Sequence, residues 1–130
     1  MSVDVPENTF VEKLTQILLE KEIRFAGFVD LSGKLVEGRL REGIIPFEND
    51  EEQQQIFREL ALRVSTRKNF DYSMGAVKYS ASRREKLVMM SFPLKKSILL
   101  ITADPHVNID RLAYKIIQIL GTDWSEFHGH

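Results

Sequence analysis

The sequence has no cysteine among its 130 residues, and its formal net charge is only −1. The lack of cysteine excludes disulfides, thiolate zinc sites, iron–sulfur clusters and cysteine nucleophiles. The nearly balanced charge of the whole chain favours neither nucleic acid nor an acidic partner. A chain of this length can bury about two-thirds of its unfolded surface in one core, so we expect a single domain.

Long apolar runs are also missing. The longest have the length of a strand, far short of the roughly 20 residues that a membrane-spanning helix requires. Charged residues interrupt the first twenty positions, which argues against a signal peptide; these are Asp4, Glu7, Glu12 and Lys13. We therefore expect a cytoplasmic protein without a membrane span.

Catalytic, cofactor and metal motifs are absent as well. The sequence contains no G-x-S-x-G, G-x-G-x-x-G or Walker pattern. The segment D-P-H-V-N-I-D at 104–110 lacks the glycine and the distal glutamate of a calcium loop. Glu126, His128 and His130 lie together at the end of the chain, but nothing nearby would orient them as metal ligands. We expect no enzymatic activity, no cofactor and no metal site.

What the sequence does contain is a clear run of three strands between Gly75 and Ala103. They are G-A-V-K-Y-S-A at 75–81, K-L-V-M-M-S-F-P at 86–93 and S-I-L-L-I-T-A at 97–103, separated by charged turns. The first strand alternates apolar and polar residues, as a strand at the edge of a sheet does. The other two are apolar on both faces, which places them in the middle of the sheet.

The remaining elements surround this run. Thr9 and Glu12 form a capping-box pattern before an amphipathic helix of about three turns, and residues 23–40 form a hairpin that turns at Ser32–Gly33. Asn49 with Glu52 marks the start of a second helix, and a third runs from Asn108 to Gly121. We expect an N-terminal arm at 1–8, one domain at 9–121 and a tail at 122–130.

Two features allow more than one interpretation. Gly27 and Gly38 inside the hairpin strands predict either a bulge or a tight helix contact, or else a groove that admits a ligand. The apolar residues of the loop at 41–48 predict either a plug beneath the second helix or a patch that binds a partner; they are Ile44, Ile45 and Phe47.

Basic residues gather in one part of the chain. Nine lie between Arg63 and Lys96 against two acidic ones, an excess of seven positive charges. The turn residues Arg83, Arg84 and Lys86 are the candidate anion contacts, although solubility alone also explains charge in turns. In a simple meander Lys95 and Lys96 would lie at the opposite end of the sheet.

The predicted order of elements is α-β-β-α-β-β-β-α, an α+β domain with a five-stranded antiparallel sheet, two helices on one face and one on the other. This order, with the D-L-S-G-K hairpin and the long helix between the second and third strands, resembles the roadblock/dynein light chain family and its profilin-like relatives. The sequence is also similar to small uncharacterised archaeal proteins of roadblock-like type. The segment E-G-I-I-P-F-E-N-D departs from the family pattern.

The resemblance implies a non-enzymatic module that forms a homodimer through its third strand and second helix. Members of that family commonly act as scaffolds or regulators of small GTPases, which makes a small GTPase the implied partner. In this chain the implied interface residues are Gln53, Phe57, Leu60, Val64, Val77 and Tyr79.

Two alternatives remain open at this point. A small-ligand sensor of PAS-like or profilin-like type would need a cavity near Gly27, Gly38 and Met89–Met90. A binder of nucleic acid or of an anionic surface would use the basic segment at 63–96, with an affinity that falls steeply with salt.

Overall fold

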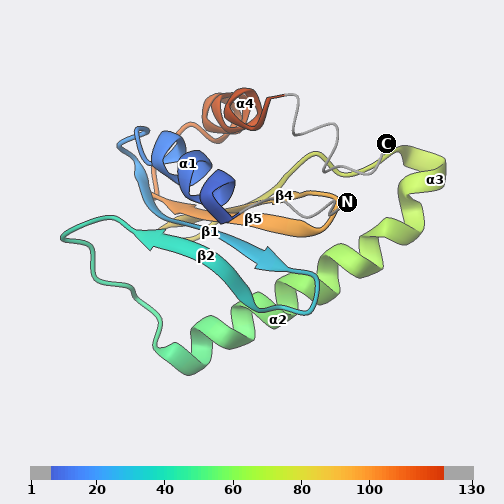
Figure 1. Cartoon of the computed structure of the whole chain (residues 1–130), viewed down its shortest axis with the longest axis horizontal. Coiled ribbons are helices and arrows are strands. Elements are labelled where there is room, and N and C mark those ends of the chain that lie inside the picture. The colour runs from blue at the N-terminus through green and yellow to red at the C-terminus, as the bar shows by residue number, and fades with distance from the viewer. Residues whose placement is uncertain (1–6, 122–130) are drawn as a thin grey trace.

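The computed structural model describes residues 7–121, which form a sheet between two layers of helix (Figure 1). The sheet has five antiparallel strands, as predicted. They pair in the order β2-β1-β5-β4-β3, with β1 and β5 inside the sheet. The strands are β1 Ile23–Asp30, β2 Leu35–Leu40, β3 Ser80–Arg83, β4 Val88–Pro93 and β5 Ser97–Ala103.

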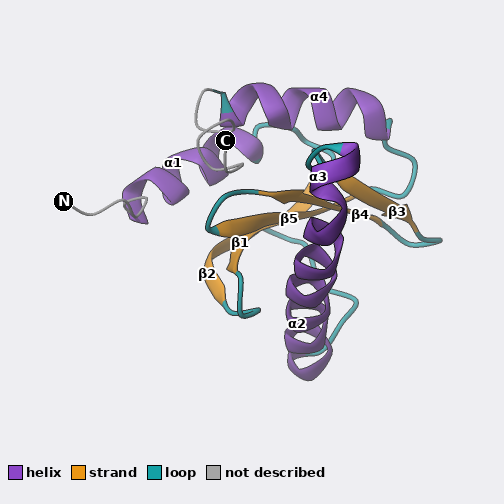
Figure 2. Ribbon diagram, turned by 90° about the vertical axis from the view of Figure 1, so that its right-hand side faces the viewer, coloured by secondary structure: helices purple, strands orange, loops and turns teal. Residues whose placement is uncertain are grey.

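Helices cover both faces of the sheet. α1 (Glu7–Ile17) and α4 (Ile109–Leu120) lie on one face, and α2 (Asp50–Arg67) crosses the other (Figure 2). This is the predicted arrangement of two helices against one. The two apolar cores on either side of the sheet differ in size, because α1 and α4 together bury more side chains than α2 does.

Strand β5 supplies both cores. All seven of its residues are buried. Leu99 and Ile101 pack beneath α1 and α4, whereas Ile98 and Leu100 pack against α2. This alternation follows from the period of two along a strand, and it explains why S-I-L-L-I-T-A is apolar at successive positions.

The helix caps follow the sequence signals at two of three sites. The Asn49 side chain accepts from the backbone N–H of Glu52 (2.8 Å), and the Glu52 carboxylate accepts from the backbone N–H of Asn49 (3.0 Å). Asn108 accepts from the backbone N–H of Arg111 at the start of α4. The predicted capping box at Thr9 is wrong, because α1 begins two residues earlier, at Glu7, and Thr9 lies inside it.

The β1–β2 hairpin turns where the sequence predicts. Gly33 has a φ of 91°, which favours glycine, and a Cβ there would lie 2.8 Å from the Arg58 Cα. Hydrogen bonds to the Asp30 carboxylate from the backbone and hydroxyl of Ser32 and the backbone of Lys34 close the turn. Burial opposes the charge on Asp30, but these bonds outweigh it and lower the pKa of that carboxyl.

The glycines of the hairpin do not open a groove. Gly27 pairs directly with Gly38, and a Cβ on Gly27 would lie 2.7 Å from the Phe25 Cζ and 2.9 Å from a Leu35 Cδ1. Side chains of the hairpin itself therefore occupy the space above both glycines. The bulge also exists, between Phe28 and Val29. The groove interpretation is wrong, and the glycines serve a close approach of side chains.

Two segments differ from the sequence expectation. The chain after α2 stays helical through a 3₁₀ turn at Lys68–Phe70 and the short helix α3 (Asp71–Met74), a stretch for which no element was predicted. Strand β3 then begins at Ser80 and not at Gly75, and the following turn closes between Arg84 and Leu87. The first glycine after α2 is Gly75, so nothing in the sequence ends the helix earlier.

Arg41 joins the end of β2 to the segment between α1 and β1. Its guanidinium donates to the backbone carbonyls of Leu18 (2.8 Å), Glu20 (2.9 Å) and Ile23 (2.6 Å). Leu18 and Glu20 follow the C-terminal end of α1, and Ile23 is the first residue of β1. One side chain therefore holds α1 at its place against the sheet.

We expect Arg41→Met to lower the free energy of unfolding by about 1 to 3 kcal/mol, because partly buried carbonyls lose their donors. Urea denaturation at neutral pH measures this change. Arg39→Met is the matched control, since Arg39 is exposed near the end of β2, just before Arg41, and should change stability by less than about 0.5 kcal/mol. Equal effects of the two substitutions would contradict the role of Arg41.

Candidate protein interface

Strand β3 lies at the edge of the sheet. Within residues 7–121 it pairs only with β4, so no strand in this part of the chain satisfies the backbone N–H and C=O groups on its other side. In the register Ala81 lies opposite Met90, and Ser82 lies opposite Met89. Because Met90 belongs to the core beneath α4 and Met89 to the core beneath α2, Ser82 points to the α2 side. An unpaired edge of this kind is a template for another strand.

Two side chains fasten this edge to the start of α4. The Arg83 guanidinium donates to the carbonyls of Pro105 and Val107, the latter at 2.8 Å. The Tyr79 hydroxyl donates to the Asp110 carboxylate (3.0 Å), and this bond raises the pKa of the Tyr79 phenol. The edge is therefore held in place before any partner arrives.

On the α2 side, the edge borders an open groove of about 1130 Å³ between α2 and the β3–β4 turn. Its apolar floor includes Ile56 and Met89. Its charged residues have both signs: five are basic and four are acidic. They are Arg58, Arg63, Arg83, Arg84 and Lys86, with Glu48, Glu52, Glu59 and Glu85.

All three candidate anion contacts line the groove, but within residues 7–121 only the Arg83 side chain is also bonded to the backbone. Its guanidinium donates to the carbonyls of Pro105 and Val107 before α4. The Lys86 ammonium also lies 5.5 Å from the centre of the Phe47 ring. With four carboxylates in the same groove, the three residues do not form a separate basic patch.

The interface residues implied by the resemblance lie mostly inside the chain. Phe57, Leu60 and Val64 are each 5% exposed or less and pack against the sheet. The Tyr79 ring lies 5.9 Å from that of Phe92, in the core beneath α4. Val77 is half-buried at the entrance to β3.

The sixth implied residue, Gln53, is half-buried beside the loop that precedes α2. That loop does not plug the space beneath α2 as one interpretation predicted, because Ile45 is 82% and Phe47 53% exposed. The guanidinium of Arg24 lies over the Phe47 ring, 4.5 Å from its centre. The alternative of an exposed patch fits these positions.

Sequence reasoning missed the apolar side chains that α2 and α3 turn outward. Leu62 is 69% exposed, three residues after the groove residue Glu59 and therefore next to it on the helix surface. Phe70, Tyr72 and Met74 are exposed where the helical segment runs past the sheet. Their only signal in the sequence is their position off the buried stripe of the helix.

Other candidate sites do not assemble. Within residues 7–121 no three His, Asp or Glu residues lie close enough to hold a metal ion. In the D-P-H-V-N-I-D segment Asn108 caps α4 and Asp110 accepts from Tyr79. Glu126, His128 and His130, with the aromatic residues of the tail, lie outside the described residues. No helix among those described is both long and apolar enough to cross a membrane.

A family model matches residues 4–130. The chain belongs to DUF6659, a family of unknown function. No curated protein matches the sequence. This family assignment covers the whole domain but carries no activity with it.

Solved structures identify the fold. A structure titled MglB with tetrameric arrangement is 12% identical, with a TM-score of 0.74 over 98% of this chain and 93% of the other. A Roadblock/LC7 domain from Streptomyces avermitilis is 8% identical, with a TM-score of 0.63 over 84% and 89%. Acanthamoeba castellanii profilin IA is 14% identical, with a TM-score of 0.54 over 90% and 95%.

This DUF6659 chain therefore has the roadblock and profilin-like fold that the order of its elements predicted. At identities this low the likeness shows the fold alone. None of these matches indicates an archaeal origin.

Tyr79→Phe tests the attachment of β3 to α4, because it removes the bond to Asp110 and keeps the ring beside Phe92. The bond raises the phenol pKa above its usual 10.0, so its stabilisation is complete below pH 10 and is lost as the pH rises through the folded-state pKa. Urea denaturation should show the wild type more stable than Tyr79→Phe at pH 8, with the difference shrinking above pH 10. A difference independent of pH would contradict the bond.

Proposed function

We propose that this protein is a non-enzymatic scaffold or adaptor that works as a homodimer. The observation that supports this most directly is the groove of mixed charge beside the free edge of β3. Pairing of two β3 strands would join the sheets of two copies into one and would satisfy the unpaired backbone groups at both edges.

The charge of the groove favours a second copy over nucleic acid. In a two-fold interface the same patch meets itself, so each patch must contain both partners of every ion pair. Five basic and four acidic residues meet that condition. A groove for nucleic acid would be dominated by one sign, since phosphate contacts supply most of the affinity.

The proposed interface keeps the two elements that the resemblance implies but uses other side chains. Phe57, Leu60 and Val64 already fill the core of their own chain. The outward face of α2, with Leu62 and Glu59, and the groove at Arg63 and Ser82 are open to a partner. An exposed leucine beside paired charges is the arrangement of an interface with an apolar centre and a polar rim.

A small GTPase is the partner class that the resemblance to roadblock proteins implies. We propose that the dimer presents its joined sheet and paired α2 helices to that partner. A purified small GTPase from the same organism, loaded with GDP or with a non-hydrolysable GTP analogue, should bind the dimer with different affinities in its two states. If both states bind equally, or neither binds, the proposal of a GTPase partner is refuted, whereas the proposal of a homodimer is unaffected.

The first test is the solution mass at several concentrations, measured by light scattering. We expect about twice the 15.0 kDa of one chain. Leu62→Glu should raise the dissociation constant at least about tenfold, or 1.4 kcal/mol, because a buried charge in the interface would lack a partner.

Leu19→Glu is the matched control, since Leu19 is 74% exposed in the segment after α1, away from the groove. It should leave the mass unchanged. Circular dichroism and thermal melting should show that both variants fold as the wild type does. A wild type that stays monomeric at every concentration, or a Leu62→Glu variant as dimeric as the control, would refute this interface.

A further inference from the structure

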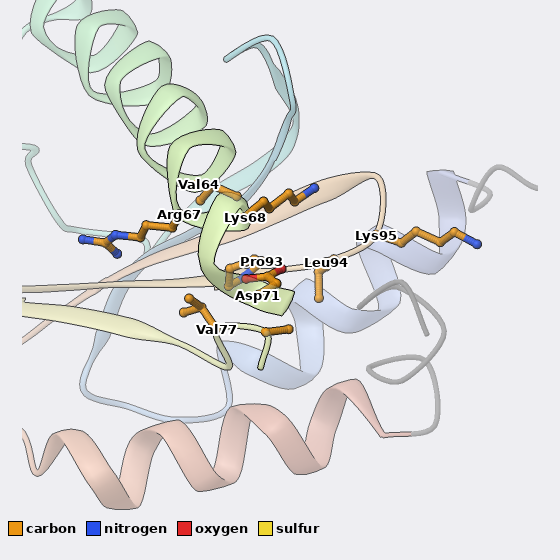
Figure 3. Close-up of a pocket in the computed structure, with 9 residues that line it drawn as sticks. Val64, Arg67, Lys68, Asp71, Val77, Pro93, Leu94 and Lys95 are labelled. Carbon is orange, nitrogen blue, oxygen red and sulfur yellow. The ribbon is translucent and has the colours of Figure 1, made fainter. Parts of the chain in front are cut away.

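A separate cavity of about 250 Å³ lies where the C-terminal end of α2 and α3 meet the β4–β5 turn (Figure 3). Most of its wall is apolar, formed by Val64, Ala76, Val77, Pro93 and Leu94. Neither the fold nor the proposed dimer groove explains it, because its residues differ from those of the groove. A cavity of about 150 Å³ is enough for benzene, so this one has room for a small molecule.

One carboxylate faces this apolar wall. Figure 3 shows the Asp71 carboxylate in the middle of the lining residues, next to Pro93. Asp71 is half-buried, and among residues 7–121 its side chain has no hydrogen-bond or ion-pair partner. A carboxylate in such a place gains from a ligand that brings a donor or a positive charge.

Three cations surround the cavity with their charged ends turned away from it. Figure 3 shows Arg67, Lys68 and Lys95 pointing outward in different directions. The Arg67 guanidinium donates to the Ser80 hydroxyl (2.6 Å) and is therefore fixed. Lys68 and Lys95 are exposed and have long, flexible side chains. The charge is thus negative inside and positive at the entrance.

We propose that this cavity binds a small zwitterion with an apolar body, the chemistry of a free apolar amino acid. Its ammonium would donate to the Asp71 carboxylate, its carboxylate would meet Lys68 and Lys95, and its side chain would contact the apolar wall. An acid without an amine would place a second negative charge beside Asp71. An amine without a carboxylate would bring no negative group to the cations at the entrance.

The site is complete within one chain, so it does not depend on dimerisation. It also differs from the PAS-like cavity considered from the sequence, which would have lain near Gly27 and Gly38. One end of a peptide would bring only one of these two charges, its N-terminal ammonium or its C-terminal carboxylate. Three ligands with the same ring separate these cases.

The probes are L-phenylalanine, L-phenylalaninamide, which lacks the carboxylate, and N-acetyl-L-phenylalanine, which lacks the ammonium. In amide proton–nitrogen NMR titrations up to roughly 10 mM, L-phenylalanine should shift signals of residues 64–77 and of Leu94 and Lys95 in a saturable way. The other two should bind at least about tenfold more weakly, since each loses one charged contact. If either of the other two binds as tightly as L-phenylalanine, the preference for a zwitterion is refuted. If no probe gives a saturable shift, the cavity is not a binding site for such ligands.

Two variants locate the ligand. Asp71→Asn keeps the shape of the side chain and should weaken the binding of L-phenylalanine at least about tenfold. Glu12→Gln, which also replaces a carboxylate by an amide but at an exposed position of α1, should leave that affinity unchanged. Val77→Phe should abolish binding by filling the cavity. Wild-type affinity in folded Asp71→Asn would refute the role of Asp71 whatever the mass of the protein, so this result is independent of the dimer test.

Discussion

The burial of β5 on both faces is the constraint on which the rest of the structure depends. Every residue from Ser97 to Ala103 is buried, and alternate side chains enter the two cores. A strand in the middle of a sheet must be covered on both sides, so helices are needed on both. α1 and α4 supply one cover and α2 the other. The remaining strands take their places outward from β5 in both directions.

Two helices cover one face of the sheet and only α2 covers the other, and the candidate sites lie on the α2 side. One helix cannot span five strands, and α2 packs over β1 and β5 through contacts with Val29, Ile98 and Leu100. The α2 side of β3 and β4 is covered only in part, where Met89 packs beneath α2 and Arg67 bonds to Ser80. The groove lies beside the β3–β4 turn. The small cavity lies where the end of α2 passes the β4–β5 turn.

Burial and capping patterns made most of this fold predictable. The apolar segment S-I-L-L-I-T-A predicted both ends of β5 correctly. The side chains of Asn49 and Asn108 identified the starts of α2 and α4. The edge strand was harder, because the segment from Gly75 to Tyr79 alternates like a strand but carries the chain from α3 to the sheet. Its alternation is real in one respect, since Tyr79 still points toward α4.

The candidate interface could not be predicted from the same patterns, because apolar periodicity identifies the side chains that pack into the core of their own chain. Phe57, Leu60 and Val64, which the resemblance implied as interface residues, belong to that buried set, whereas the exposed Leu62 does not. Charge counting fails for a related reason. The excess of positive charge between 63 and 96 does not form one surface, because Arg67 is bonded to Ser80 and Arg83 to two backbone carbonyls. Charged side chains form a binding site only where the fold brings them together, and in this groove it brings together side chains of both signs.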